Sequence, residues 1–266
     1  MAAPTAVRFD ADGEQPWVQL GASLESGFTI AGWVYMSVDC GDYTTLFDVD
    51  DGTTTEWVLL QSDSGGDAMR ADVSDAVNGS ATALTISTWY FVALWFSGTQ
   101  AGWYYAALAD PTLTAGGSTA TTGGETGIDY VRLGESIYGG EWFNGRIQGV
   151  KLWDVVLTEP QLEDERTQLD PVKTSDIVSS WRLASQTDTT DYSGSNTLSA
   201  MTGATTEAGS GIENTSGTVE TVIRPIADTA ATGWDSAPTG SQSLWSQVDE
   251  AVTSDTDYIY TTDPNP

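Results

Sequence analysis

The chain has 266 residues, with 38 acidic and nine basic side chains, no histidine and a formal net charge of −29 at pH 7. The lack of histidine excludes Ser-His-Asp and Cys-His catalytic systems and histidine-ligated zinc. The single cysteine excludes an intrachain disulfide. The few lysines and arginines form no basic patch, so we expect neither nucleic acid nor an anionic membrane as a partner.

The net charge also indicates the kind of environment in which the protein works. A surface this negative repels itself, so added salt should stabilise the compact state. Together with the scarcity of lysine, this suggests a marine or halophilic host. The merely acidic surface of many exported β proteins is an equal alternative.

Short apolar segments separated by polar runs rich in glycine, serine and threonine predict an all-β chain. We expect nine strands before residue 110: Ala6–Phe9, Trp17–Leu20, Phe28–Met36, Tyr43–Val49, Glu56–Gln61, Met69–Val73, Leu84–Ile86, Trp89–Phe96 and Trp103–Leu108. Asp50, Asp51 and Gly52 are predicted to form a hairpin turn. The low-complexity segment Thr112–Gly127 is predicted to be an exposed, mobile loop.

The segment Tyr130–Leu169 carries the most information. Apolar side chains alternate from Trp142 to Val156, which predicts a hairpin with a glycine bend or bulge. Thr158 and Gln161 have the spacing of a helix capping box, and Leu162 with Leu169 supplies an apolar stripe. The acidic run Glu163, Asp164 and Glu165 is interpreted as the solvated face of that helix.

Three segments together resemble a laminin G-like domain, the concanavalin A-like jelly roll. They are the strand with Phe28, Thr29, Ile30, Gly32, Trp33 and Val34, the strand from Ser87 to Leu94, and the Tyr130–Leu169 block. The resemblance implies a two-sheet antiparallel jelly-roll sandwich with one short helix and a C-terminal extension. Val178–Leu198 is similar to a segment often found at the start of such domains. Its late position implies either a closing strand or a permuted chain.

We expect the sandwich to occupy residues 1–200, followed by a Thr-, Ala- and Gly-rich linker at 201–217. Residues 218–266 contain strand-like runs at Val219–Ile226 and Asp257–Thr261, with too few apolar residues for a core of their own. They resemble a segment of tailed-phage structural proteins. This implies an assembly arm that other virion proteins or further copies of this chain, such as a trimer, complete. The candidate assembly residues are Trp234, Leu244, Trp245, Tyr258 and Ile259. The alternative is a small β appendage packed on the chain's own sandwich.

The sequence contains no set of residues that indicates an enzyme. Retaining glycosidases of this fold carry a strand of the form E-x-D-x-E or E-x-D-x-x-E, because two carboxylates must face one sugar, and no such strand is present. No Walker loop, dinucleotide fingerprint or EF-hand loop appears either. We therefore expect no catalytic residue.

Two ligand sites remain open as hypotheses. Laminin G-like domains often bind Ca²⁺ with loop carboxylates, and Asp48, Asp50 and Asp51 are candidate ligands; the same residues also suit a plain hairpin turn. No other cofactor is expected. Aromatic rings could stack on a glycan. The candidates are Trp103, Tyr105, Tyr138 and Trp142, although most tryptophans in such a fold fill the core.

The N-terminal residues have no signal-peptide pattern, and no apolar run is long enough to span a bilayer. We therefore expect a non-enzymatic virion structural protein, a capsid decoration, turret or fibre subunit. It would be made in the host cytoplasm, exposed on the particle surface and extracellular after release, with cell-surface glycans as possible partners. A secreted carbohydrate-binding adhesin is the alternative, and a divergent glycoside hydrolase of the same fold is the third.

Overall fold

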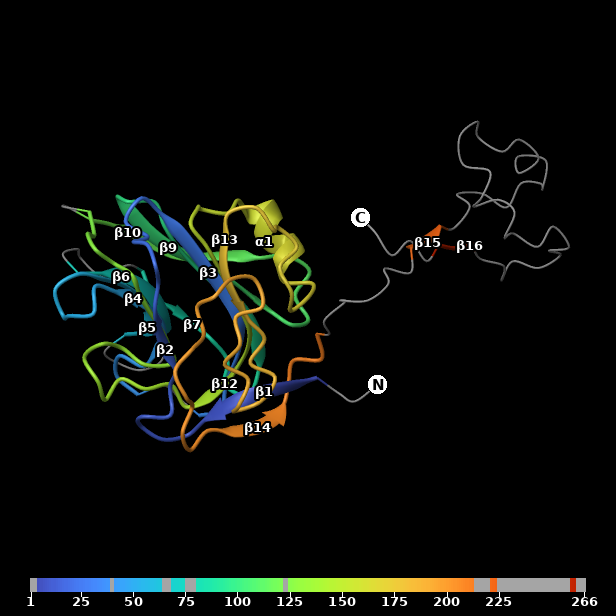
Figure 1. The fold of residues 1–266 in the computed structure, drawn as a ribbon, viewed down its shortest axis with the longest axis horizontal. Helices are drawn as coiled ribbons and strands as arrows, with labels where there is room; N and C mark the ends of the chain where they lie inside the picture. The colour runs from blue at the N-terminus through green and yellow to red at the C-terminus, as the bar shows by residue number, and fades with distance from the viewer. Residues whose placement is uncertain are drawn as a thin grey trace, which may run out of the picture. The chain divides into compact units, whose positions relative to one another are not determined.

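The structure is a computed structural model. It describes residues 4–38, 41–63, 68–74, 80–121 and 124–212, and the strand backbones 221–223 and 259–261. The chain divides into two units, Met1–Asn214 and Thr215–Pro266. In the first unit, two antiparallel sheets and a single short helix account for the regular structure of the described residues (Figure 1). The predicted all-β jelly-roll sandwich is confirmed.

One sheet has eight strands among the described residues, in the order β10-β9-β8-β3-β12-β1-β14, with β13 also paired to β12. Its strands are β1 (Thr5–Phe9), β3 (Phe28–Met36), β8 (Trp89–Phe96), β9 (Gln100–Ala107), β10 (Thr114–Ala120), β12 (Gly145–Trp153), β13 (Ile177–Trp181) and β14 (Thr205–Ala208). Two long predicted runs, Phe28–Met36 and Trp89–Phe96, coincide with β3 and β8 and pair with each other.

In the described residues, the other sheet has six strands in the order β2-β11-β4-β5-β6-β7. They are β2 (Trp17–Gln19), β4 (Thr45–Asp50), β5 (Trp57–Ser62), β6 (Ala68–Val73), β7 (Thr82–Ala83) and β11 (Tyr130–Leu133). Successive side chains of a strand point to opposite faces. In β11, for example, Val131 and Leu133 are buried in the core, and Tyr130 and Arg132 point outward.

Apolar side chains of both sheets interlock in one main core, which includes Phe9, Phe28, Phe47, Phe143 and Trp181, all without exposed surface. Burial of this kind stabilises by about 1.5–3 kcal/mol for each large side chain. The predicted glycine bulge lies in β12. Gly149 has a φ of +61°, and a Cβ there would lie 2.6 Å from Leu169. Only glycine fits both conditions.

Helix α1 (Glu159–Glu165) begins as predicted. The amide of the N-cap residue Thr158 donates to Gln161 Oε1 at 2.9 Å. This is one of the two hydrogen bonds of a capping box. Leu162 and Leu169 pack with Trp33 and Trp153 in a second core on the outer face of the eight-stranded sheet. The prediction of a solvated acidic run is wrong for Glu165, whose side chain has no exposed surface and pairs with Lys151.

Two loop predictions are also wrong. Within the predicted mobile loop, β10 pairs with β9 over Thr114–Ala120, with a bulge between Ala115 and Gly117. Glycine is needed there because a Cβ on Gly116 would lie 2.0 Å from the Trp103 ring. The predicted linker begins too early, since β14 pairs with β1 and Met201 is buried.

The segment Val178–Leu198 contributes a late strand to the eight-stranded sheet, because β13 pairs antiparallel with β12. In the second unit, β15 (Thr221–Ile223) pairs antiparallel with β16 (Ile259–Thr261), and each strand falls within a predicted run. The other candidate assembly residues and Cys40 lie outside the described residues. Within the described part of the chain, no helix has the length and apolarity needed to cross a membrane.

Candidate functional site

The outer face of the six-stranded sheet carries aromatic and charged side chains. Tyr130 on β11 lies opposite Asp50 on β4, and Asp50 lies opposite Trp57 on β5. Since neighbouring strands are about 4.8 Å apart, this row spans about 10 Å. Six side chains make up what we call the aromatic–acid face: Trp17, Asp50, Trp57, Tyr130, Arg132 and Tyr138. Asp50 has no exposed surface of its own and lies beneath the other five.

One end of this face is an aromatic pair on β2 and β11. The rings of Trp17 and Tyr130 have centroids 5.9 Å apart, and the Trp17 side chain is 45% exposed. Tyr130 is held from behind by the turn after β4, where Gly52 has a φ of +77° and a Cβ would lie 2.6 Å from the tyrosine ring. The glycine therefore lets the turn close against Tyr130 while Trp17 stays open to solvent.

The other end is a second pair of rings. Trp57 Nε1 donates to the Tyr138 hydroxyl at 2.8 Å, and the two rings meet edge to face at 6.1 Å. Tyr138 comes from the loop between β11 and β12, residues 134–144, and is 49% exposed. The loop thus lies over the sheet and brings an exposed ring to the face, as the Gly139–Gly140 turn beside it allows.

Between the two ring pairs lies an ion pair. Arg132 Nε donates to Asp50 Oδ2 at 2.7 Å, and the guanidinium carbon lies 5.7 Å from the centroid of the Tyr130 ring. Asp50 also accepts from the Gly52 amide at 2.7 Å. The guanidinium is therefore fixed by a carboxylate and a ring, and is available for further hydrogen bonds only at its outer edge.

A second carboxylate lies beneath this surface. Asp48 has no exposed surface; its Oδ2 accepts from the Ile137 amide at 2.8 Å, and its Oδ1 has no hydrogen-bond partner among the described residues. Burial, first, and the neighbouring Asp50 charge hold the pKa of Asp48 well above its usual range. A neutral carboxyl here would be a hydrogen-bond donor as well as an acceptor.

The predicted calcium ligands do not converge. Asp48 is buried, Asp50 is paired with Arg132, and Asp51 accepts from the amide and hydroxyl of Thr53 at 2.7 Å in the predicted turn. In the described part of the chain, no three carboxylate, histidine or cysteine side chains are grouped to hold a metal ion.

The four predicted glycan-stacking residues do not lie together on one surface. Trp103 is only 1% exposed and fills the core, so its ring offers no face to a ligand. Tyr105 is half-buried against Trp103, with ring centroids 5.1 Å apart. Tyr138 lies on the aromatic–acid face, and Trp142 is half-buried in the loop that carries Tyr138.

Sequence reasoning missed Trp17, Trp57, Tyr130 and Arg132. The available signal was the alternation in β11, where Tyr130 and Arg132 flank Val131. It shows that the two polar side chains share a face. It does not show which strands lie beside β11, and these strands supply the rings and Asp50.

The sequence profile of the concanavalin A-like lectin/glucanases superfamily matches residues 12–163, more than half of the chain. The chain belongs to this superfamily. A search of curated proteins finds no match.

This superfamily member is similar to several solved structures. A candidate carbohydrate-binding protein from Bacteroides ovatus gives a TM-score of 0.54 at 16% identity over 78% of this chain, which spans 60% of that protein. A pentraxin from Limulus polyphemus gives 0.40 at 15% identity, over 60% of this chain and 80% of that one. The enzymatically active domain of bacteriophage CBA120 tailspike protein 2 gives 0.47 at 13% identity, over 62% and 27%. The Bacteroides structure, at 16% identity, supports a shared fold and nothing finer.

Proposed function

We propose that the sandwich is a non-enzymatic glycan-binding domain that holds an oligosaccharide across the aromatic–acid face. The observation that carries the proposal is the exposed Trp17 ring beside Tyr130, with the Trp57–Tyr138 ring pair at the other end and the partly exposed Arg132, held by the buried Asp50, between them. Sugar rings stack their C–H faces on aromatic side chains, and their hydroxyls bond to charged groups between them. The carbohydrate-binding description of the Bacteroides protein agrees with this choice.

A glycoside hydrolase of the same fold is the second candidate, because Asp48 and Asp50 share one face of β4 and the pKa of Asp48 is raised. A protonated acid beside a second carboxylate is the arrangement that glycosidases use. Two observations favour binding over catalysis. Asp48 is covered by the 134–144 loop, and Asp50 is held by Arg132. Neither carboxylate is free to reach a glycosidic bond.

The test is a glycan array probed with the full chain at molar salt, followed by titration of the best ligand. We expect Trp17→Ala to weaken binding at least about tenfold, by analogy with stacking residues at other interfaces. The matched control is Ile86→Ala, because Ile86 has the same 45% exposure and lies outside the face. Equal binding by both variants, or release of reducing sugar by the parent protein, would refute the proposal.

For its setting, we propose the surface of a virus particle, with residues 218–266 as the assembly arm. Support comes from the resemblance of the C-terminal residues to tailed-phage proteins and from the net charge of −29. A secreted adhesin is the alternative. Light scattering of the full chain and of a version ending at Gly217 distinguishes them, because assembly through the arm requires an oligomer for the full chain and a monomer for the shorter one.

A further inference from the structure

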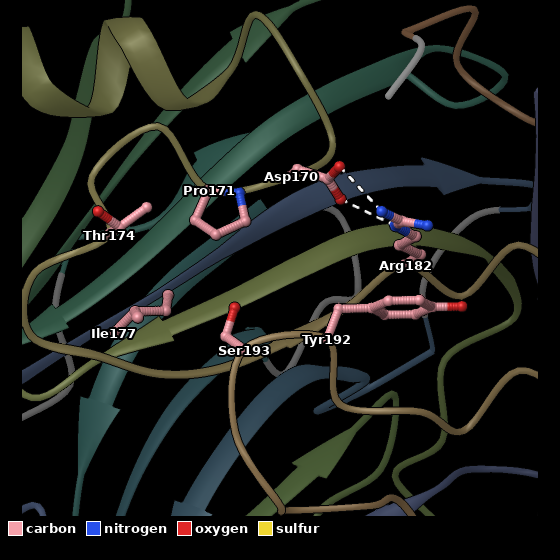
Figure 2. A pocket seen from close by; sticks show the side chains of 7 residues that line it. All are labelled: Asp170, Pro171, Thr174, Ile177, Arg182, Tyr192 and Ser193. Carbon is pink, nitrogen blue, oxygen red and sulfur yellow. Dashed lines mark hydrogen bonds and ion pairs between the residues drawn. The ribbon is translucent and has the colours of Figure 1, made fainter. Parts of the chain in front are cut away.

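A separate half-open pocket of about 420 Å³ lies against β13, which belongs to the eight-stranded sheet. Figure 2 shows that its walls come from the loop after α1, from Ile177 on β13, and from the turn that carries Tyr192 and Ser193. None of its lining residues belongs to the aromatic–acid face, which is built on the other sheet.

The charged group in this pocket is a fixed carboxylate. Arg182 holds Asp170 with two parallel hydrogen bonds, Nε to Oδ1 at 2.8 Å and Nη2 to Oδ2 at 3.0 Å. The guanidinium stacks on the Tyr192 ring at 4.1 Å, and the Tyr192 hydroxyl donates to Asp188 at 3.1 Å. Each Asp170 oxygen keeps a second lone pair for a ligand, and the clamp fixes its direction.

The pocket also offers uncommitted hydroxyls and apolar surface. The side chains of Thr174 and Ser193 make no hydrogen bond with the described residues, and Figure 2 shows Ser193 Oγ directed toward the space beside Pro171. Pro171 and Ile177 supply apolar surface to the same space. A ligand here meets a charged acceptor, two hydroxyls and an apolar wall.

We propose that this pocket binds one neutral sugar residue and is a second glycan site of the protein. Sugar hydroxyls donate to Asp170 and exchange hydrogen bonds with Ser193 and Thr174, and the C–H face of the ring lies on Pro171 and Ile177. The volume falls near the lower end of the range for small-molecule sites, about 300–1,000 Å³. Because Arg182 already compensates Asp170 and the chain carries −29, an anionic sugar is disfavoured.

The test is amide chemical-shift mapping of the full chain during titration with three neutral probes, the methyl α-pyranosides of mannose, glucose and galactose. We expect saturable shifts, with at least one probe, in the amides of residues 170–177, 182, 192 and 193. Ser193→Phe fills the pocket and leaves the Asp170–Arg182 pair intact, so it should weaken binding at least about tenfold. Val172→Ser is the matched control, because Val172 is exposed beside the pocket and does not line it.

Thr174→Trp closes the opposite end of the pocket and provides the same measurement if the Ser193 substitution disturbs folding. Trp17→Ala should bind the probe at this pocket like the parent, which separates this site from the aromatic–acid face. The proposal is overturned if no probe gives saturable shifts at these residues up to about 100 mM. Binding that survives both filled-pocket variants, or equal binding of methyl β-D-glucuronide, also overturns it.

Discussion

Lys151 and Asp48 are both fully buried ionisable side chains, and the protein surrounds them differently. Lys151 Nζ donates to Glu165 Oε2, to the Glu165 carbonyl and to the Gln168 carbonyl, each at 2.8 Å. Asp48 has one amide donor, one oxygen without a partner among the described residues, and a carboxylate neighbour in Asp50. All three ammonium protons are satisfied in the first case, and half of the carboxylate is unsatisfied in the second.

The difference separates a structural cluster from one that lies under the proposed binding face. The Lys151 cluster joins α1 to β12, and its hydrogen bonds offset the cost of burying two charges. Burial lowers the pKa of Lys151, and the Glu165 carboxylate opposes that shift. Asp48 lies under the aromatic–acid face at a cost in stability that the Ile137 amide and the nearby Arg132 charge offset only in part. Unsatisfied buried groups of this kind concentrate at functional sites.

Breaking the Lys151 cluster should have the largest effect. Glu165→Ala leaves a buried ammonium without its carboxylate and should destabilise the fold by about 3–5 kcal/mol. The measurement is urea unfolding at pH 7 in constant salt. Asp164→Ala is the control, because Asp164 is the exposed neighbour on the same helix and should change stability by less than about 0.5 kcal/mol. Similar losses in both variants would show that helix propensity, rather than the buried pair, is responsible.

Another carboxylate with its hydrogen bonds satisfied is Asp191, in the turn after β13. Asp191 accepts from the backbone amides of Ser180, Ser193, Gly194 and Asn196, each at 3.0 Å. Asp191→Ala orphans these donors and should cost about 2–3 kcal/mol, and Asp191→Asn, which keeps an acceptor oxygen, should cost less. Thermal unfolding of the three proteins tests this order; an equal loss for both variants would contradict it.

Asp48→Asn should act in the opposite direction. The pKa of Asp48 in the folded state lies above the value of about 3.8 expected when unfolded, so the folded protein holds its proton more tightly. Stability from this group is therefore lost as pH rises through the interval between the two values. At pH 7 the neutral Asn side chain of the variant removes that loss of stability. We therefore expect a melting temperature higher by a few degrees, since 1 kcal/mol corresponds to about 2–4 °C for a chain of this size.

The melting temperature of the parent, of Asp48→Asn and of the exposed-site control Asp154→Asn, measured from pH 4 to 8, tests this expectation. The gain of Asp48→Asn over the parent should shrink as the pH falls, and the control should follow the parent throughout. A lower melting temperature for Asp48→Asn at pH 7 would mean that the charged carboxylate stabilises the site.

The sequence predicted the features that local rules determine. The capping box of α1 depends on Thr158 and Gln161, three residues apart, and the bulge in β12 depends on Gly149. β3 and β8 are long, nearly continuous apolar runs, so their burial is visible without knowing their neighbours. The all-β class follows from the same signals.

The features that were missed depend on contacts between distant segments. β10 has the composition of a loop, and it is a strand because Gly116 admits the ring of Trp103 from β9. In the same way, alternation places Trp103 and Tyr105 on one face without showing that this face is the core. Glu163 and Glu165 are two residues apart in the sequence, and only the position of Lys151 on β12 distinguishes the buried one.

The smallest change in stability should accompany the largest change in binding. Trp17 is 45% exposed and contacts only one ring in the described part of the chain, so Trp17→Ala should alter unfolding by less than about 0.5 kcal/mol. The proposed glycan loses its stacking platform in the same variant, so its affinity should fall while the melting curve stays unchanged. Unfolding and glycan titration of one preparation measure both quantities. Gly52→Ala sharpens the test, because the new Cβ displaces Tyr130 without removing any ring. A loss of affinity there as well would show that the arrangement of the two rings, rather than exposed aromatic surface alone, recognises the ligand.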